Sequence, residues 1–410
     1  MITRRRFVAT SLTAALASWG LPAWADQRFA AVLARLQGYV DDGKLPFAAI
    51  RIARHGQVLA EAHFGGVEPI GPESRYRVYS MTKPVVAAGL MQLVDAQRLK
   101  LDDPVAAHVP AFADLQVLGT DGDTREPART MTVAHLLTHS CGLANSWGNA
   151  RVAPLYRQAG LVAGSWMYDE AIGGLEGFAE RLAQLPLEFQ PGSDWIYGYG
   201  LDIAGLVVER VSGRRLGEYL RQQLFEPLGM HSTGFQVPPE HAGQLAGLYS
   251  AAGGTLAPIR NGSETLALRQ PFADGGSAGL LSTLEDYGRF ADMLANGGER
   301  DGVRVLSAAA VATMTSPYGE QAPLLSSLTA FGRYEAGSIG QGLGGVVRLD
   351  DRSGPGSAGE YAWGGAAGTG FWATPKLGLS VTLMTQLMPV TALPARDLLR
   401  PAIYRALAAG

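Results

Sequence analysis

The apolar residues of the first hundred positions change their spacing from segment to segment, and each spacing predicts a different element. Residues 28–40 repeat apolar side chains at helical intervals. Residues 48–53 and 58–64 are two short apolar runs on either side of turn-like residues 54–57, which predicts a pair of strands. The segment that begins at Ser80 is apolar nearly all round a helix, and a helix without a polar face is buried.

The remaining chain separates into a helical middle and a carboxyl-terminal part of short strands. Residues 98–270 are mostly helical or loop-like, with polar patches at 118–129 and 251–264. A helix is expected at 283–296, where two glycines end it. Later strands are expected at 346–349, 361–363, 370–374 and 379–385, and a closing helix at 396–408. Strands therefore lie at both ends of the chain, with helices between them.

The first 25 residues have the pattern of an export signal. Three arginines, Arg4 to Arg6, precede a modestly apolar stretch from 7 to 21, and Ala23-Trp24-Ala25 fits a cleavage site. The stretch is too short to span a membrane, and the arginines resemble the twin-arginine export signature. We expect a periplasmic protein without stable membrane association, because no later segment reaches 18 uninterrupted apolar residues. An uncleaved amino-terminal anchor is the alternative.

Composition and charge exclude several classes of protein. The 410 residues are 47% hydrophobic and 17% charged, which fits a folded chain and not a disordered one. The net charge is −3 and no basic run follows the first residues, so no nucleic-acid partner is expected. The single cysteine, Cys141, excludes an intrachain disulfide and a cysteine-rich metal site. No phosphate loop or dinucleotide fingerprint is present, so no cofactor is expected.

Two histidines, His135 and His139, stand four residues apart on a segment expected to be helical, a spacing that could place both on one metal ion. Leu136 follows His135 where a metalloprotease motif has glutamate, and no third ligand is evident. We expect these histidines to have a structural role near the candidate catalytic residues named below, and we expect no metal ion.

Two motifs suggest a serine nucleophile. Gly275-Gly276-Ser277-Ala278-Gly279 matches the Gly-x-Ser-x-Gly elbow, whose mechanism needs a histidine later in the chain, and none of the seven histidines follows Ser277. The residues before it also form a poor strand, so Ser277 is interpreted as part of a turn. The other motif is Ser80-Met81-Thr82-Lys83.

Ser80 and Lys83 stand three residues apart, which places both side chains on one face of a helix turn. Burial disfavours the charged form of lysine, and a neutral amine beside a serine hydroxyl is a general base beside a nucleophile. A capping serine with a solvated lysine is the equally weighted alternative from this motif alone.

The whole set of motifs resembles the serine β-lactamase and penicillin-recognising family across nearly all of the chain after residue 25. Within it, the chain looks most like the family VIII carboxylesterases, the esterase branch related to class C β-lactamases. The stretches that carry the resemblance are, in chain order, Ser80-Met81-Thr82-Lys83, residues 134–143, Pro191-Gly192-Ser193-Asp194-Trp195-Ile196-Tyr197, residues 225–230, residues 279–283 and residues 363–372.

Two departures favour the esterase branch. The second motif, Tyr-x-Asn in class C enzymes, is Tyr197-Gly198-Tyr199 here. The third, Lys-Thr-Gly, is Trp363-Gly364-Gly365, a tripeptide typical of the esterases. Without that lysine, the cation that would hold a β-lactam carboxylate is missing.

The resemblance implies a role for each site residue. Ser80 attacks the acyl carbonyl, Lys83 accepts or relays its proton, and Tyr197 protonates the leaving alkoxide and activates the deacylating water. The backbone N–H groups of Ser80 and Ala366 would form the oxyanion hole. Substrate contacts are expected from Trp363, Gly364, Gly365 and Tyr199.

The resemblance also implies an α+β fold, with an antiparallel sheet flanked by helices and an inserted, mostly helical domain. Residues 26–97 and 270–410 would form the sheet domain, and residues 98–269 the insert, after a signal peptide at 1–25. The expected function is hydrolysis of small carboxylic esters, short-chain or aromatic, through an acyl-enzyme. The alternatives are a β-lactamase, a D-amino-acid peptidase or an acyltransferase on the same scaffold, and a non-catalytic ligand-binding module.

Overall fold

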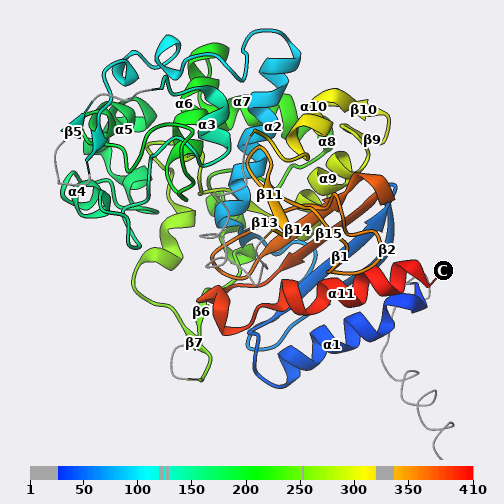
Figure 1. Ribbon diagram of the computed structural model, residues 1–410. Coiled ribbons are helices and arrows are strands. Elements are labelled where there is room, and N and C mark those ends of the chain that lie inside the picture. The colour runs from blue at the N-terminus through cyan, green and yellow to red at the C-terminus, as the bar shows by residue number, and fades with distance from the viewer. Residues whose placement is uncertain (1–25, 120–123, 126–128, 252–253, 320–336, 410) are drawn as a thin grey trace, which may run out of the picture.

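A seven-stranded antiparallel sheet joins the two ends of the chain (Figure 1). The computed structural model describes residues 26–119, 124–125, 129–251, 254–319 and 337–409, and the expected export signal lies outside them. Since β1 pairs with β15, the amino-terminal hairpin and the carboxyl-terminal strands form one sheet. In spatial order the strands are β11 (Ile339–Gln341), β12 (Val346–Arg348), β13 (Tyr361–Gly364), β14 (Gly370–Thr374), β15 (Leu379–Met384), β1 (Ala48–Arg54) and β2 (Gln57–Phe64).

Helices cover both faces of this sheet. The helices α1 (Ala30–Asp41) and α11 (Ala395–Ala408) lie side by side across one face (Figure 1). The helix α9 (Leu284–Ala295) packs on β1, β14 and β15, and its Asp292 forms a buried ion pair with Arg51 of β1 at 2.8 Å. Successive side chains of a strand point to opposite faces, so Ile50 and Ile52 point away from α9, and both are fully buried.

The sequence pattern locates most of these elements correctly. The expected helices at 28–40, 283–296 and 396–408 are confirmed as α1, α9 and α11, and six of the sheet strands lie within two residues of their expected bounds. Thr283 begins α9 as a cap, because its hydroxyl accepts a hydrogen bond from the Asp286 N–H. Strand β11 was not expected, since three residues that include Gly340 show no alternation.

The helix α2 (Thr82–Asp95) runs through the interior, as its lack of a polar face predicts. Eleven of its fourteen residues are buried, and it packs against α6 (Gly200–Ser212) and α10 (Ala308–Met314). Its first turn therefore holds Lys83 inside the protein, and Ser80 lies directly before that turn.

The remaining elements build the helical part and several two- or three-stranded sheets. The helices are α3 (Val133–Leu137), α4 (Ala153–Gln158), α5 (Gly174–Ala183), α7 (Leu216–Leu220) and α8 (Glu226–Leu228). The short strands are β3 (Tyr76–Arg77) with β8 (Leu281–Ser282), β4 (Val117–Leu118) with β5 (Thr124–Arg125), β9 (Glu299–Arg300) with β10 (Val303–Arg304), and β6 (Tyr249–Ser250) between β7 (Ala257–Pro258) and β16 (Leu387–Met388). Within the described ranges no helix has the length and apolar character needed to cross a bilayer.

Candidate active site

Ser80 lies in a single 3-10 turn, Tyr79–Met81, that leads directly into α2. The turn is held at both ends, because the Thr82 hydroxyl donates to the Tyr79 carbonyl and the buried Tyr287 hydroxyl donates to the Met81 carbonyl, each at 2.7 Å. Tyr79 has a positive φ of 46°, a conformation that non-glycine residues rarely adopt and that often marks a functional site. The half-buried Ser80 side chain is thus presented from a fixed backbone.

Tyr197 stands between Ser80 and Lys83. Its hydroxyl oxygen lies 2.5 Å from Ser80 Oγ and accepts a 2.5 Å hydrogen bond from Lys83 Nζ. Lys83 is only 1% exposed and also donates to the carbonyl of Ser277 at 2.7 Å. The three side chains named from the sequence therefore meet in one hydrogen-bonded row, in which the tyrosine hydroxyl bridges the serine and the lysine.

Glycines allow Tyr197 to reach this position. A Cβ on Gly198 would lie 1.8 Å from the Leu143 carbonyl oxygen, and one on Gly200 would lie 2.5 Å from that of Leu136. Real Cβ atoms do not approach that closely, so both positions exclude a side chain. The segment just before the tyrosine is also tied down, because Ile196 N–H donates to the His139 carbonyl.

Aromatic rings surround the Tyr197 ring. The Trp363 ring stacks on it with centroids 6.1 Å apart, the His139 ring lies at 4.9 Å, and the Trp147 ring lies at 5.9 Å. Trp147 is 49% exposed, so one wall of the cluster reaches the surface. Sequence reasoning missed Trp147, which belongs to none of the motifs identified in the sequence.

His135 and His139 do not share a helix face, which corrects the expected placement. The helix α3 ends at Leu137, and His139 follows it with a positive φ of 57°. His135 belongs to the capping box of α3, where its Nδ1 accepts the Thr132 N–H. His139 is buried against Trp195, Trp363 and Tyr197, and burial, together with the charge of Lys83, holds its pKa well below the ordinary value. Among the described residues, no cluster of three or more His, Cys, Asp or Glu side chains could bind a metal.

Ser277 enters the site through its backbone. Its carbonyl accepts from Lys83, and its N–H donates to Asp202 Oδ1 at 2.9 Å. A Cβ on Gly276 would lie 1.9 Å from the Leu201 carbonyl oxygen, so this loop packs directly on the first turn of α6. The interpretation of the Gly-x-Ser-x-Gly match as a turn agrees with this geometry. Asp202 was not assigned a role from sequence, although an acid within an apolar run was its signal.

The third motif ends strand β13, beside the turn that precedes Ser80. Trp363 is 9% exposed, and Gly364 and Ala366 are half-buried. A Cβ on Gly365 would lie 2.5 Å from the Val78 carbonyl oxygen, so the β13–β14 turn that carries Ala366 packs on the segment leading to Ser80. The side chain of Arg396 fills the space over Gly364 and Gly370, where no Cβ would fit.

Tyr199 is not at the site, contrary to the substrate contact expected from sequence. Its side chain is 2% exposed and packs among Tyr156 and Phe178. Its hydroxyl donates to the Leu161 carbonyl at 2.6 Å and lies 3.0 Å from the Ser146 hydroxyl. Tyr197 and Tyr199, which flank Gly198, point in different directions, and of the two only Tyr197 faces Ser80.

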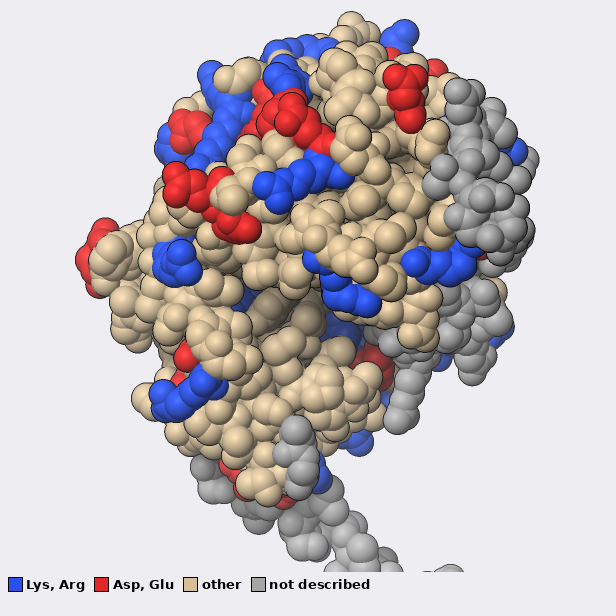
Figure 2. Space-filling view, turned by 90° about the vertical axis from the view of Figure 1, so that its left-hand side faces the viewer, with Lys and Arg blue, Asp and Glu red and all other residues tan. Residues whose placement is uncertain are grey.

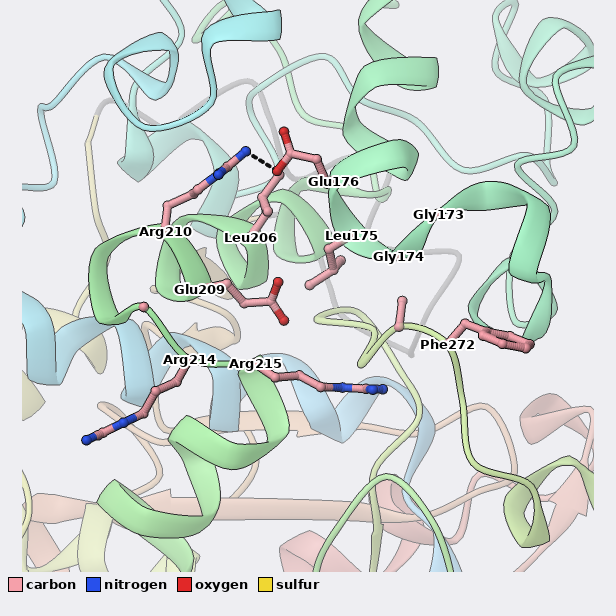
Figure 3. Close-up of a pocket in the computed structure, with 12 residues that line it drawn as sticks. Gly173, Gly174, Leu175, Glu176, Leu206, Glu209, Arg210, Arg214, Arg215 and Phe272 are labelled. Atoms are coloured by element: carbon pink, nitrogen blue, oxygen red, sulfur yellow. Dashed lines mark ion pairs between the residues drawn. The ribbon is translucent and has the colours of Figure 1, made fainter.

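The surface of the described residues has several hollows, and two of them differ in character. Figure 2 shows a recess between the upper and lower parts of one face, much of it lined by uncharged residues. A separate pocket of about 380 Å³ lies between the start of α5, the end of α6, the loop that precedes α7 and residues 272–273. Glu209 and Arg215 point into it in Figure 3, and burial raises the pKa of Glu209 to about 6. Its lining includes neither Ser80, Lys83 nor Tyr197, so it is distinct from the cluster described above.

Comparisons with known proteins agree with this architecture. A family model described as Beta-lactamase matches residues 32–403. Esterase EstB of Burkholderia gladioli is 30% identical over 87% of this chain and 91% of its own, and Lovastatin esterase of Penicillium rubens is 31% identical over 70% and 73%. The solved structure of EstCE1, titled a hydrolase with promiscuous acyltransferase activity, has a TM-score of 0.79 and 26% identity, and covers 93% of this chain and 99% of its own.

Proposed function

The chain belongs to the β-lactamase family and is a serine carboxylesterase within it, and we propose that it cleaves small apolar esters in two steps with Ser80 as the nucleophile. The observation that carries the proposal is the hydrogen-bonded row of Ser80 Oγ, Tyr197 Oη and Lys83 Nζ. A weak hydroxyl nucleophile needs an adjacent base, and the base needs a partner that orients it. The row supplies both the base and the partner that orients it.

In the first step the Ser80 oxygen bonds to the ester carbonyl carbon, while its proton passes to the Tyr197–Lys83 pair. The negative carbonyl oxygen would lie against the N–H groups of Ser80 and Ala366, and one such donor is worth roughly 2.7–4 kcal/mol. The carbon–oxygen bond to the alcohol then breaks, and the proton held by the pair moves to the departing alkoxide. Ser80 is left as an ester of the acid.

In the second step water takes the place of the alcohol. It gives a proton to the Tyr197–Lys83 pair and bonds to the acyl carbon, and the bond to Ser80 breaks as the serine regains a proton. An alcohol entering in place of water would give acyl transfer instead. This second candidate function is favoured by the aromatic walls formed by Trp147 and Trp363, which provide an apolar surface beside Tyr197.

The substrate is proposed to be an ester rather than a β-lactam. Trp363, Gly364 and Gly365 stand where lactamases have Lys-Thr-Gly, so this strand offers an apolar ring and no ammonium for a carboxylate. The stacked Trp363 and Tyr197 rings suit a short acyl chain or a small aromatic group.

The test is a substrate panel with wild-type protein and Ser80→Ala. It contains p-nitrophenyl esters from acetate to octanoate, nitrocefin and a D-alanyl-D-alanine peptide, with and without an added alcohol. We expect ester hydrolysis that the substitution abolishes and negligible nitrocefin turnover. Dominant nitrocefin hydrolysis would reject the esterase assignment, and no turnover of any substrate would favour a ligand-binding module.

We also propose that the protein reaches the periplasm by the twin-arginine route. The support is the arrangement of Arg4 to Arg6, the apolar stretch after them and Ala23-Trp24-Ala25. Lysine in place of Arg4 and Arg5 should leave the precursor in the cytoplasm, as fractionation and immunoblotting would show. Unchanged export would reject this route.

A further inference from the structure

Asp202 is a buried carboxylate to which the two-step mechanism gives no role. It lies in the first turn of α6 and is 1% exposed, although aspartate is seldom buried without a partner. Burial raises its pKa above the ordinary value, and hydrogen bonding to Ser277 and the charge of Lys83 offset only part of that rise. Its environment is therefore linked to the active-site lysine.

Asp202 connects to the reacting groups through the loop that carries Ser277. Its Oδ1 accepts from Ser277 N–H at 2.9 Å, and the carbonyl of the same residue accepts from Lys83 Nζ at 2.7 Å. Because Gly276 has no room for a Cβ against Leu201, the loop sits flush on the helix turn that holds Asp202. The carboxylate thus determines where the Ser277 carbonyl lies, and that carbonyl helps to direct Lys83 toward Tyr197.

The charge of Asp202 matters as well as its hydrogen bond. Lys83 is buried, and its two hydrogen bonds go to uncharged oxygens of Tyr197 and Ser277. A buried cation without a compensating charge is costly. When Asp202 is ionised, its negative charge and the positive charge of protonated Lys83 attract each other, which lowers the pKa of Asp202 against the larger effect of burial.

We propose that Asp202 is a positioning residue of the esterase reaction, which through Ser277 holds Lys83 against Tyr197 and balances the charge that Lys83 carries with its proton. This inference rests on the proposed function of Ser80, Lys83 and Tyr197. It extends the row of interacting groups to five residues that come from the 3-10 turn of Ser80, α2, α6 and two loops.

Asp202→Asn tests the proposal with little change of shape. The amide oxygen still accepts from Ser277 N–H, whereas the negative charge is lost. Asp286→Asn is the matched control: Asp286 is also buried, its Oδ2 accepts the Ser232 N–H at 2.7 Å, and burial raises its pKa. Asp286 belongs to α9 and has no contact with Lys83 among its hydrogen bonds.

The readouts are kcat and KM for p-nitrophenyl butyrate, and the rate constant for labelling of Ser80 by a fluorophosphonate, which also counts folded sites. For Asp202→Asn we expect kcat per labelled site to fall by about tenfold to a hundredfold, the range for one interaction with a charged group, with KM nearly unchanged. The labelling rate constant should fall in parallel, and Asp286→Asn should keep both rate constants. A merely structural role would lower the labelled fraction and leave the rate per site unchanged.

A wild-type rate per site in Asp202→Asn would overturn the charge-balancing role, because the amide keeps the hydrogen bond from Ser277 N–H and loses only the charge. Asp202→Ala removes both the charge and the hydrogen bond, and a wild-type rate per labelled site there would overturn the positioning role as well. Failure of wild-type protein to label at Ser80 would instead reject the proposed ester mechanism, so the two failures are distinguishable.

Discussion

Replacing Tyr197 with phenylalanine removes a single oxygen that makes two short contacts. Ser80 Oγ and Lys83 Nζ each lie 2.5 Å from it, and Lys83 keeps only the Ser277 carbonyl when it is gone. Proton transfer by a positioned side chain contributes about 10²- to 10⁴-fold in rate, or about 2.7–5.4 kcal/mol of barrier. Since no other described side chain bridges serine and lysine, we expect kcat to fall within that range.

The assay compares kcat and KM for p-nitrophenyl butyrate in Tyr197→Phe and Tyr199→Phe. The second variant is a matched control, because Tyr199 is buried and its hydroxyl donates to the Leu161 carbonyl. Tyr199→Phe should lose about 1–3 kcal/mol of stability in denaturant titration and keep its kcat. A Tyr197→Phe enzyme within about tenfold of wild type would refute the assigned proton transfer.

Three further predictions concern the surroundings of the site and the pocket in Figure 3. Trp363→Ala should raise KM for phenyl acetate by about three- to tenfold more than it raises KM for ethyl acetate, since it removes one ring of the stacked pair. An equal rise in KM for both esters would contradict the aromatic contact. Burial lowers the pKa of His139 below 6.5, so folded stability should fall as the pH drops below that value, by up to about 1.4 kcal/mol per pH unit. Denaturant titrations at pH 7.5 and 5.5 should show a smaller loss of stability in His139→Phe than in wild type. An equal loss in both proteins would contradict the lowered pKa. The pKa of Glu209 is raised from 4.5 to about 6, so its contribution to folded stability is full below pH 4.5 and is lost as the pH rises through 6. Glu209→Gln should therefore be more stable than wild type by up to about 2 kcal/mol at pH 7 and equally stable at pH 4. An equal gain in stability at both pH values would contradict the raised pKa.

Periodicity and local motifs predict the elements of this fold well. The strands at both chain ends and the buried helix after Ser80 were visible because alternation and an apolar surface all round a helix are strong local signals. The same signals are absent from β11, which has three residues, one of them glycine. They also give no indication that β6 pairs with the distant β16. Such pairings depend on contacts between segments far apart in the sequence.

The site was predictable where a motif names the residue and unpredictable where packing decides. Ser80, Lys83 and Tyr197 belong to recognisable motifs, and they meet in space. Tyr199 belongs to the same motif as Tyr197, yet the close packing of Gly198 and Gly200 turns it into the protein interior. The abundance of glycine, 53 of the 410 residues, has a partial explanation here, because several glycines leave room for a neighbouring backbone.

Backbone contacts were the hardest feature to foresee. Ser277 was correctly interpreted as a turn residue, but its carbonyl reaches Lys83 only because the loop packs on α6. No side-chain pattern encodes the direction of a carbonyl group, and the part played by Asp202 follows from that direction.

The proposed ester hydrolysis depends most directly on the identity of the nucleophile, and the chain offers Ser80 and Ser277 as rival candidates. Mass spectrometry of the peptides from fluorophosphonate-treated wild-type protein tells them apart. We expect one adduct per chain on the peptide that contains Ser80, and none in Ser80→Ala, with ester hydrolysis lost in parallel. An adduct on the Ser277 peptide, or hydrolysis that persists in Ser80→Ala, would contradict the assignment of Ser80.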